Sequence, residues 1–220
     1  MTTTQERETI YVGVDIEKTG NMMMKHPVIS VGFAVCKNDA KYTVLAKRRF
    51  NFAVNWPSDS DFGDFEPRCW TEFWSKLPVD VIQACKMDAL EQEDGWKQVA
   101  AWLDALEVEY PDDKYRITFV NDNPAFDIGN IDYFLEKYTG RHPMRYTRDG
   151  GYRSVTVVDD VLYMIHPDIR DDIQNYAKSI VSHDHNPEND AHYMCIVLFE
   201  LIKARTATFV EDDKWYAKDE

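Results

Sequence analysis

Closely spaced cysteines are absent from this sequence. Its four cysteines lie far apart in the chain, and no Cys-x-x-Cys pair occurs. A cysteine-based zinc site or a disulfide framework is therefore not expected, and a reducing compartment is the default.

Long apolar segments are missing as well. No run of apolar residues is long enough to cross a membrane. The first residues, MTTTQERET, lack the apolar core of a signal peptide. We therefore expect a soluble, cytoplasmic protein that has no membrane partner.

Positive charge is also scarce. The chain has 39 acidic and 25 basic residues, which gives a net charge of −14. A protein that binds nucleic acid over a broad surface is basic, so this class is excluded, and any action on nucleic acid needs a local site or bound cations. What is present is 44% hydrophobic residues in 220, which suits one folded domain.

The segment 10–17, IYVGVDIE, alternates apolar residues with others at a period of two. This pattern predicts a strand with one buried face. Asp15 and Glu17 then project from the same face at its end, and two carboxylates so close repel each other unless a cation lies between them. The strand therefore predicts half of a divalent-metal site; the alternative is a solvent-facing strand end.

The other expected elements follow from the same periodicities. Alternation or continuous apolar runs predict four more strands, at 28–36, 42–52, 116–121 and 154–158. Helical spacing predicts helices at 70–77, 91–110, 126–138, 168–180 and 187–205, with a further short helix after Pro78. Segment 53–68 is expected to be a long loop, and about 206–220 a polar tail. Three strands followed by alternating helices and strands predict an α/β fold with a mixed sheet.

Two more acids stand at expected helix starts. Asp127 directly follows the strand 116–121, and Asp190 lies in the first turn of the last helix. Acids at helix starts are stabilised by the helix dipole, so for each alone helix stabilisation is the alternative. Together with Asp15 and Glu17 they make a set of four acids suited to divalent cations.

Two histidines precede the last helix, and both are candidates for a general base. Asn186 is expected to be the N-cap, and Pro187 suits the first helical position. This start places His185 beside Asp190, whereas His183 lies further out. His185 is therefore the expected base; the alternative is that it merely packs beside the cap.

Three motifs resemble those of DEDDh 3′→5′ exonucleases. They are Asp15-x-Glu17, the stretch NPAFDIGNIDYF with Asp127, and HNPENDA with His185 and Asp190. The family includes the proofreading epsilon subunit of bacterial replicative polymerases, ribonuclease T and oligoribonuclease. The spacing of five from His185 to Asp190 fits the histidine branch of this family.

A weaker similarity connects the chain to a viral, phage and mycobacterial exoribonuclease-like branch. It rests on Phe73-Trp74, on Arg148-Asp149 and on Arg153-Ser154. The chain departs from the family at Lys18, where a small polar residue is common. Residues 22–24 and the loop 53–68 also lack a counterpart.

The resemblance implies a ribonuclease H-like fold, a mixed five-stranded sheet flanked by helices, in a single exonuclease domain over residues 1–220. It implies a metal-dependent 3′–5′ exonuclease that hydrolyses phosphodiester bonds from the 3′ end of single-stranded RNA or DNA by a two-metal mechanism. Two Mg²⁺ or Mn²⁺ ions are the expected cofactors. The implied catalytic set, whose acids also bind the metals, is Asp15, Glu17, Asp127, Asp190 and His185.

The 3′ end of a single strand is the expected partner, and a homodimer is allowed for. The expected substrate-binding residues are Ile16, Thr19, Gly20, Asn123, Phe126 and Arg148. For Phe126 the alternative is core packing. The basic stretch 47–49 and the arginines in 141–153 are expected to attract phosphates; the alternative is a solvated face.

Two rival functions remain open. A ribonuclease H-like endonuclease also uses clustered acids, but it does not need a histidine five residues before the last aspartate. A catalytically silent nucleic-acid-binding module could have kept the fold without the reaction.

Overall fold

A computed structural model describes residues 7–147, 151–165 and 169–216, and its centre is a five-stranded sheet. The strand order is β3-β2-β1-β4-β5. The strands are β1 (Glu8–Lys18), β2 (Val28–Cys36), β3 (Val44–Asn51), β4 (Tyr115–Asn121) and β5 (Ser154–Val157). The first three strands pair antiparallel, whereas β4 runs parallel to β1 and β5 parallel to β4. The predicted mixed five-stranded sheet is therefore confirmed.

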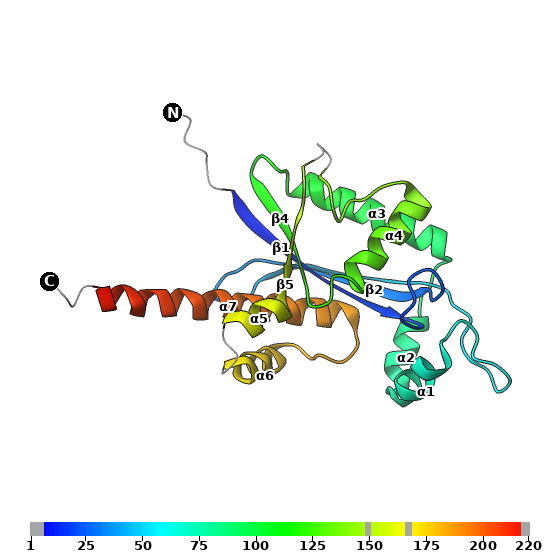
Figure 1. The fold of residues 1–220 in the computed structure, drawn as a ribbon. Coiled ribbons are helices and arrows are strands. Elements are labelled where there is room, and N and C mark those ends of the chain that lie inside the picture. Colours follow the sequence, from blue (N-terminus) through cyan, green and yellow to red (C-terminus); the bar gives the residue numbers. More distant parts are fainter. Residues whose placement is uncertain (1–6, 148–150, 166–168, 217–220) are drawn as a thin grey trace.

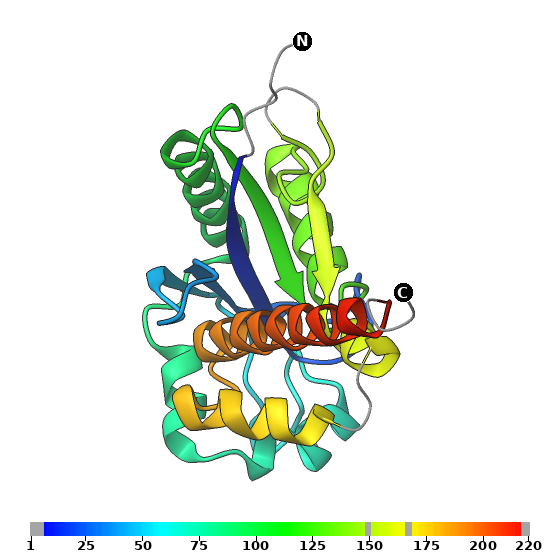
Figure 2. The same cartoon turned by 90° about the vertical axis from the view of Figure 1, so that its left-hand side faces the viewer.

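Helices cover both faces of this sheet (Figures 1 and 2). One face carries α3 (Gln92–Glu109) and α4 (Asp127–Thr139), and the other carries α5 (Val158–Ile165), α6 (Arg170–Ile180) and α7 (Pro187–Tyr216). A third group of short helices, α1 (Pro67–Glu72), the 3₁₀ helix η1 (Trp74–Lys76) and α2 (Val79–Lys86), lies at one end of the sheet. Within the described parts of the chain, no helix is both long and apolar enough to cross a membrane.

The side chains of β1 alternate between two faces, one that packs under α3 and α4 and one that faces α7. Val12, Val14 and Ile16 are buried against α3 and α4, in a core that contains Trp96 stacked on Phe52 at a ring-centroid distance of 4.6 Å. Residues at odd positions of the strand therefore face α7, as the period of two requires.

Helix α7 lies directly on the backbone of the sheet because two glycines leave room for it. A Cβ atom at Gly13 would come within 1.9 Å of the Ala191 carbonyl oxygen, and one at Gly32 within 2.1 Å of the Pro187 carbonyl carbon. Both contacts involve backbone atoms, which cannot yield as a flexible side chain can. The two glycines thus bring the first turn of α7 against β1 and β2.

The predicted helix 70–77 is not one continuous helix in the structure. The chain leaves helical geometry at Phe73, whose φ is −125° and ψ is −75°, so α1 ends at Glu72 and η1 begins at Trp74. The cause lies in the loop 53–68, where Trp56 and Phe65 pack on the buried Trp74 at 5.7 Å and 5.8 Å. Turning Trp74 into this cluster breaks the helix and turns Phe73 elsewhere.

Two other elements differ from the expectation. Residues from Val158 onward form the unpredicted helix α5 rather than a strand end followed by loop. Helix α7 continues through Tyr216, into the stretch that the sequence predicts to be a polar tail.

Candidate functional site

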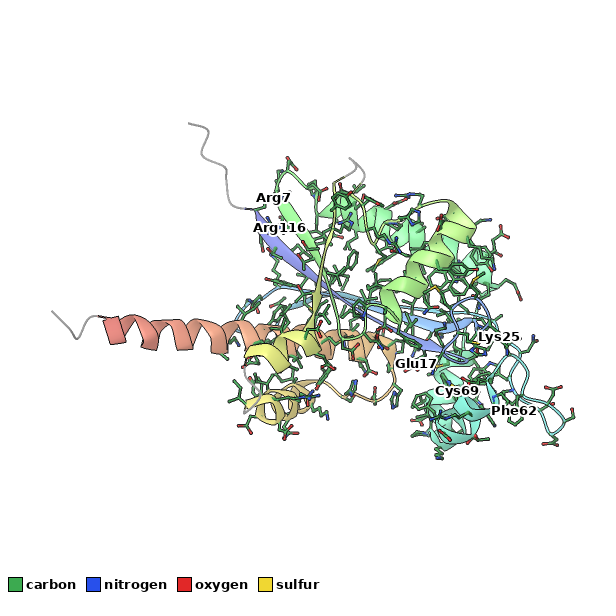
Figure 3. All side chains as sticks on the ribbon, viewed as in Figure 1. Arg7, Glu17, Lys25, Phe62, Cys69 and Arg116 are labelled. Carbon is green, nitrogen blue, oxygen red and sulfur yellow. The ribbon has the colours of Figure 1, made fainter. Side chains whose placement is uncertain are left out.

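Three of the five predicted catalytic residues meet at the end of β1. Glu17 comes from β1, His185 from the loop before α7, and Asp190 from the first turn of α7. One potential ligand atom from each of the three lies within 4.8 Å of the others. The Nδ1 atom of His185 lies 3.6 Å from Oε1 of Glu17. Figure 3 shows Glu17 beside the start of α7.

Asp190 shapes the loop that carries the histidine. Its Oδ1 accepts the backbone N–H of Asp184 and its Oδ2 that of His185, both at 3.1 Å. His185 has a φ of 62°, a left-handed conformation that is uncommon for a residue other than glycine. Such a conformation persists where the surroundings hold it, so the Asp190 carboxylate stabilises the presentation of His185.

Asn186 acts as a cap through its backbone only. Its carbonyl oxygen accepts the N–H groups of Asn189 and Asp190 at 2.8 Å and 2.9 Å. Helix α7 begins at Pro187 as predicted, but the side-chain oxygen of Asn186 is buried and has no partner among the described residues, so this N-cap lacks the usual side-chain hydrogen bond. The Asp190 carboxylate orders this loop instead.

Asp127 is held at the start of α4 by an amide that also binds β1. The Nδ2 atom of Asn121 donates to Oδ2 of Asp127 at 2.9 Å and to the carbonyl oxygen of Val14 at 2.8 Å. Ile16 adds a backbone hydrogen bond to the carboxylate. Asn121 thereby ties the ends of β1 and β4 to the first turn of α4, which the sequence analysis did not foresee.

Asp15 lies outside the group of three donors but inside the same field of negative charge. Burial raises its pKa well above the usual range, and the charges of Glu17, Asp127 and Asp190 raise it further. The structure therefore places all four predicted acids around the end of β1, although only Glu17 and Asp190 share the tightest cluster with His185.

The electrostatics of this cluster favour a bound cation. Burial raises the pKa of Asp127 to about 7, and burial and the charge of Glu17 raise that of Asp190 to about 7. Burial also raises the pKa of Glu17, against the effect of His185. Buried carboxylates that repel one another ionise readily only near positive charge, and their hard oxygen atoms match divalent cations such as Mg²⁺. The donor set thus fits the metal chemistry expected from the sequence.

The two histidines have different surroundings. The pKa of His185 is raised, chiefly through its contact with Glu17, and the ring of Phe73 meets its imidazole edge-on at 4.8 Å. His183 instead stacks on Tyr193 at 4.6 Å, and burial lowers its pKa. Only His185 belongs to the group of potential ligands within the described residues.

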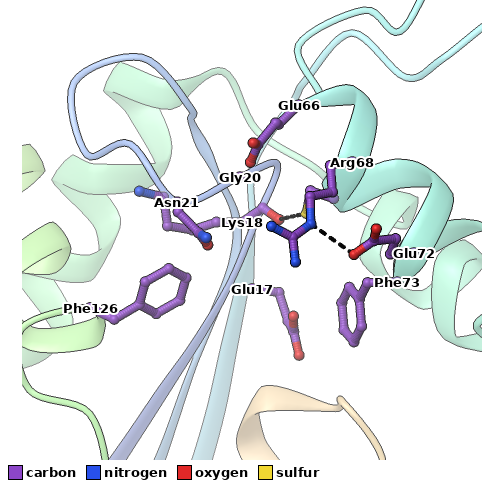
Figure 4. A pocket seen from close by; sticks show the side chains of 10 residues that line it. Glu17, Lys18, Gly20, Asn21, Glu66, Arg68, Glu72, Phe73 and Phe126 are labelled. Carbon is purple, nitrogen blue, oxygen red and sulfur yellow. Dashed lines mark hydrogen bonds and ion pairs between the residues drawn. The ribbon is translucent and has the colours of Figure 1, made fainter.

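A cavity of about 380 Å³ opens beside Glu17. Figure 4 shows Phe73 and Phe126 on opposite sides of the Glu17 carboxylate, with Arg68 above it. Arg68 also forms an ion pair with Glu72 at 2.8 Å. Two aromatic walls and a guanidinium suit a group that has an apolar ring and a negative charge.

Lys18 lines the cavity, although the sequence marked it only as a departure from the DEDDh pattern. Its side chain is buried, and its Nζ donates to Oδ1 of Asn130 at 2.5 Å and lies 5.5 Å from the centre of the Phe126 ring. Burial lowers the pKa of Lys18 to about 8. The adjacency of Lys18 to Glu17 was the available signal, but the partner Asn130 is remote in the chain.

The other predicted substrate-binding residues divide into groups. Gly20 and Phe126 line the cavity. The side chains of Ile16 and Thr19 are buried, and neither residue is part of the cavity lining. Asn123 accepts the N–H of Phe126 with its side chain and is absent from the cavity lining. Arg148 lies outside the described residues.

The described arginines of the predicted basic loop 141–153 form ion pairs within the protein. Each of three arginines contacts a carboxylate of α3 or α4. The pairs are Arg141 with Asp104, Arg145 with Asp132, and Arg153 with Glu107. These ion pairs join the loop to α3 and α4 and partly neutralise the charges that the sequence predicts to attract phosphates.

Comparison with known proteins gives a structural likeness only. No family model and no curated protein sequence matches the chain. The product-bound structure of exonuclease I is 14% identical, with a TM-score of 0.52 over 92% of this chain and 45% of that one. Escherichia coli exonuclease I with zinc and single-stranded DNA is 13% identical, with a TM-score of 0.51, over 93% of this chain and 42% of its own.

A third structure agrees with these two. Escherichia coli exonuclease I in complex with a 5cy-dA13 oligonucleotide has a TM-score of 0.54 at 12% identity, over 90% of this chain and 41% of that one. The chain thus spans less than half the length of these exonuclease I chains. The likeness, together with the mixed sheet and its flanking helices, establishes a ribonuclease H-like α/β fold.

Proposed function

We propose that the protein is a metal-dependent 3′–5′ exonuclease of the DEDDh type, which removes nucleotides from the 3′ end of single-stranded RNA or DNA. The observation that carries this proposal is the meeting of Glu17, His185 and Asp190 at the mouth of a cavity with aromatic walls. Support also comes from the fold shared with exonuclease I, which has been crystallised with single-stranded DNA.

The proposed cation ligands are Asp15, Glu17, Asp127 and Asp190. Two bound Mg²⁺ or Mn²⁺ ions would supply Lewis-acid stabilisation of the negative charge that develops during phosphodiester hydrolysis. Burial and neighbouring carboxylates together raise the pKa of Asp15, Asp127 and Asp190, which supports the assignment of this acidic group to positive ions.

His185 is the proposed general base. A neutral imidazole that faces the site can accept the proton of the attacking water. The hydrogen bond from the His185 backbone to Asp190 and the edge contact with Phe73 restrict the position of the ring, which a base needs.

Phe73 and Phe126 are proposed to hold the terminal nucleotide. Aromatic side chains stack on any base, and such a site tolerates different sequences. Phe126 is attached to the start of α4, directly before Asp127, and Phe73 lies against His185. A base between the two rings would therefore bring its own phosphate close to the proposed ligands.

One copy of the chain contains every proposed catalytic residue, so the reaction is assigned to a single domain over residues 1–220. A homodimer is not required for it.

The decisive experiment compares strands that have a free 3′ end with blocked and circular strands, which do not. Purified protein is given 5′-labelled RNA and DNA single strands with a free 3′ hydroxyl, the same strands with a blocked 3′ end, and a circular single strand, with Mg²⁺ or with excess EDTA. We expect a ladder that shortens from the free 3′ end, in Mg²⁺ only. Asp15→Asn serves as the inactive control.

Each rival function predicts another result. Cleavage of the circle would favour the endonuclease. Binding of the strands without any product, under all metal conditions, would favour the silent module. Full turnover in EDTA would exclude the metal-dependent reaction.

A further inference from the structure

Strand β3 forms one edge of the sheet and carries three consecutive basic residues, Lys47, Arg48 and Arg49. Among the described residues, none of the three makes an ion pair with a carboxylate. This differs from the loop after α4, whose described arginines are all paired. On a chain with a net charge of −14, three unpaired adjacent cations are a distinct local feature.

The register of the sheet relates this edge to the proposed catalytic site. Asp15 pairs with Gly32 of β2, and Gly32 pairs with Arg49 of β3. Directly opposed residues of neighbouring strands share a face of the sheet, and so do alternate residues of one strand. Lys47 and Arg49 therefore share a face with Asp15, and two strand spacings place the Cα atoms of Arg49 and Asp15 about 10 Å apart.

The first turn of α7 lies between these two places. It rests on Gly32, where a Cβ would collide with Pro187. Its Asn189 accepts a hydrogen bond from the Lys47 Nζ at 3.0 Å, while Asp190 joins the catalytic cluster. The basic edge and the proposed metal ligands are thus on two sides of a single helical turn.

The edge is also hollowed. A groove of about 440 Å³ is lined by all three basic residues, with Asp88 and Glu188 in the same wall. Arg48 lies over the ring of Phe50, with 5.0 Å from its guanidinium carbon to the ring centre. The groove therefore offers cations along a strand that pairs with no other described strand on its outer side.

We propose that Lys47, Arg48 and Arg49 form a phosphate-binding track for the part of a single strand that lies 5′ to the scissile bond. This rests on the proposed exonuclease function, because that function supplies the strand. Lysine and arginine contacts to phosphates position a nucleic acid without reading its sequence. The competing explanation is that charges on an edge strand prevent two sheets from pairing.

Substrates of two lengths distinguish binding at the phosphate track from binding at the catalytic site. An unphosphorylated dinucleotide contains one phosphate, the scissile one, and so leaves none for β3. A 12-nucleotide strand has phosphates left over for the track. Each phosphate contact made by a cation also contributes about 0.7 to the log–log dependence of single-strand affinity on salt.

The test uses the double variant Lys47→Gln/Arg49→Gln and the matched control Lys114→Gln/Arg116→Gln, which removes the same charge at exposed positions absent from the groove lining. We expect the double variant to raise KM for the 12-nucleotide strand and to reduce its salt slope by about 1.4, for two lost contacts. The KM and kcat of the double variant for the dinucleotide should equal those of the control variant. The charge-retaining variant Lys47→Arg/Arg49→Lys should keep the wild-type salt slope.

Two results would overturn the proposal of a phosphate track. The first is a long-strand KM and salt slope equal to those of the control. The second is self-association of the neutral variant in gel filtration, with an unchanged KM for its monomer, which would assign the charges to edge protection.

Failure of the proposed function gives a different result, because then neither substrate is cleaved by the wild-type protein. The track is tested in that event by fluorescence anisotropy with the labelled 12-nucleotide strand. Weaker binding and a lower salt slope for the double variant than for the control would support it, and equal binding would overturn it.

Discussion

The Nδ1 atom of His185 lies 3.6 Å from the Oε1 atom of Glu17, although most of the chain separates the two residues. This contact raises the pKa of the imidazole and so favours its protonated form. A base must be neutral to accept a proton. Positive charge beside Glu17 would offset the effect of the carboxylate, which links the state of His185 to cation binding.

Replacing His185 should therefore affect turnover far more than replacing His183. We expect His185→Ala to lower kcat by about 10²–10⁴-fold, the usual contribution of a general base, while cation affinity is retained. His183→Ala is the matched control and should lose little, because His183 stacks on Tyr193 instead. Single-turnover rates and Mg²⁺ titrations measure both effects. Near-wild-type turnover of His185→Ala would remove the histidine from the mechanism.

Neutralising Asp15 should stabilise the cation-free protein. The charges of Glu17, Asp127 and Asp190 repel the Asp15 carboxylate, so Asp15→Asn relieves repulsion. We expect a higher Tm in EDTA together with lost activity. Asp190→Ala should instead lower Tm, because it removes the acceptor of two backbone hydrogen bonds. Thermal melts of the two variants in EDTA decide; a lower Tm for Asp15→Asn would mark that acid as structural.

Stability without cations should fall as pH rises from about 4 to about 7. In this window the unfolded chain has released the protons of Asp127 and Asp190, which ordinarily have a pKa near 3.8, whereas the folded protein retains them up to about 7. Urea unfolding in EDTA measures the trend, and Asp127→Asn should flatten it. Added Mg²⁺ should stabilise more at pH 8 than at pH 5, since its ligands must be deprotonated. A Mg²⁺ effect independent of pH would contradict this account.

Removing the Phe73 ring should weaken substrate binding. Stacking of a base on an aromatic side chain contributes about 1–3 kcal/mol, so Phe73→Ala should raise KM by about 5–150-fold. Phe62→Ala is the control, because Phe62 is an exposed phenylalanine of the preceding loop and is absent from the cavity lining. Initial rates against dinucleotides give the comparison. A fall in kcat with KM unchanged would show that Phe73 serves His185 rather than the nucleotide.

Arg145 should matter for stability rather than for the substrate. It pairs with Asp132, whose side chain is 1% exposed, so Arg145→Gln leaves a buried carboxylate without its cation. We expect the free energy of unfolding to fall by about 1–3 kcal/mol and KM to stay unchanged. Lys97→Gln, which breaks an exposed pair with Glu93, should change stability by less than about 1 kcal/mol. Urea titrations and a salt series of KM separate the two roles.

The local pattern of β1 was sufficient to predict the acidic half of the site. A period of two places Asp15 and Glu17 on one face, helix-start patterns place Asp127 and Asp190 in first turns, and the resemblance to the DEDDh motifs joins the four. These predictions depend on neighbours in sequence, which is why they could be made without coordinates.

The remaining features depend on contacts between distant residues. Helical spacing is the same whether or not a helix breaks at Phe73, and the break arises from packing of Trp74 on Trp56 and Phe65. The pairing of Arg141 and Arg153 likewise requires carboxylates of α3, far away in the chain. The sequence therefore named both basic segments as candidates to attract phosphates, but it could not show that the described arginines of 141–153 form ion pairs.

The seating of α7 on Gly13 and Gly32 has a consequence for biosynthesis. Glu17 emerges from the ribosome well before His185 and Asp190, and only the docked helix brings them together. Pairing of segments so far apart in sequence is slow compared with local folding. A nascent chain that has not yet reached the first turn of α7 therefore has no assembled cluster, and any activity that needs the cluster can begin only after α7 has docked.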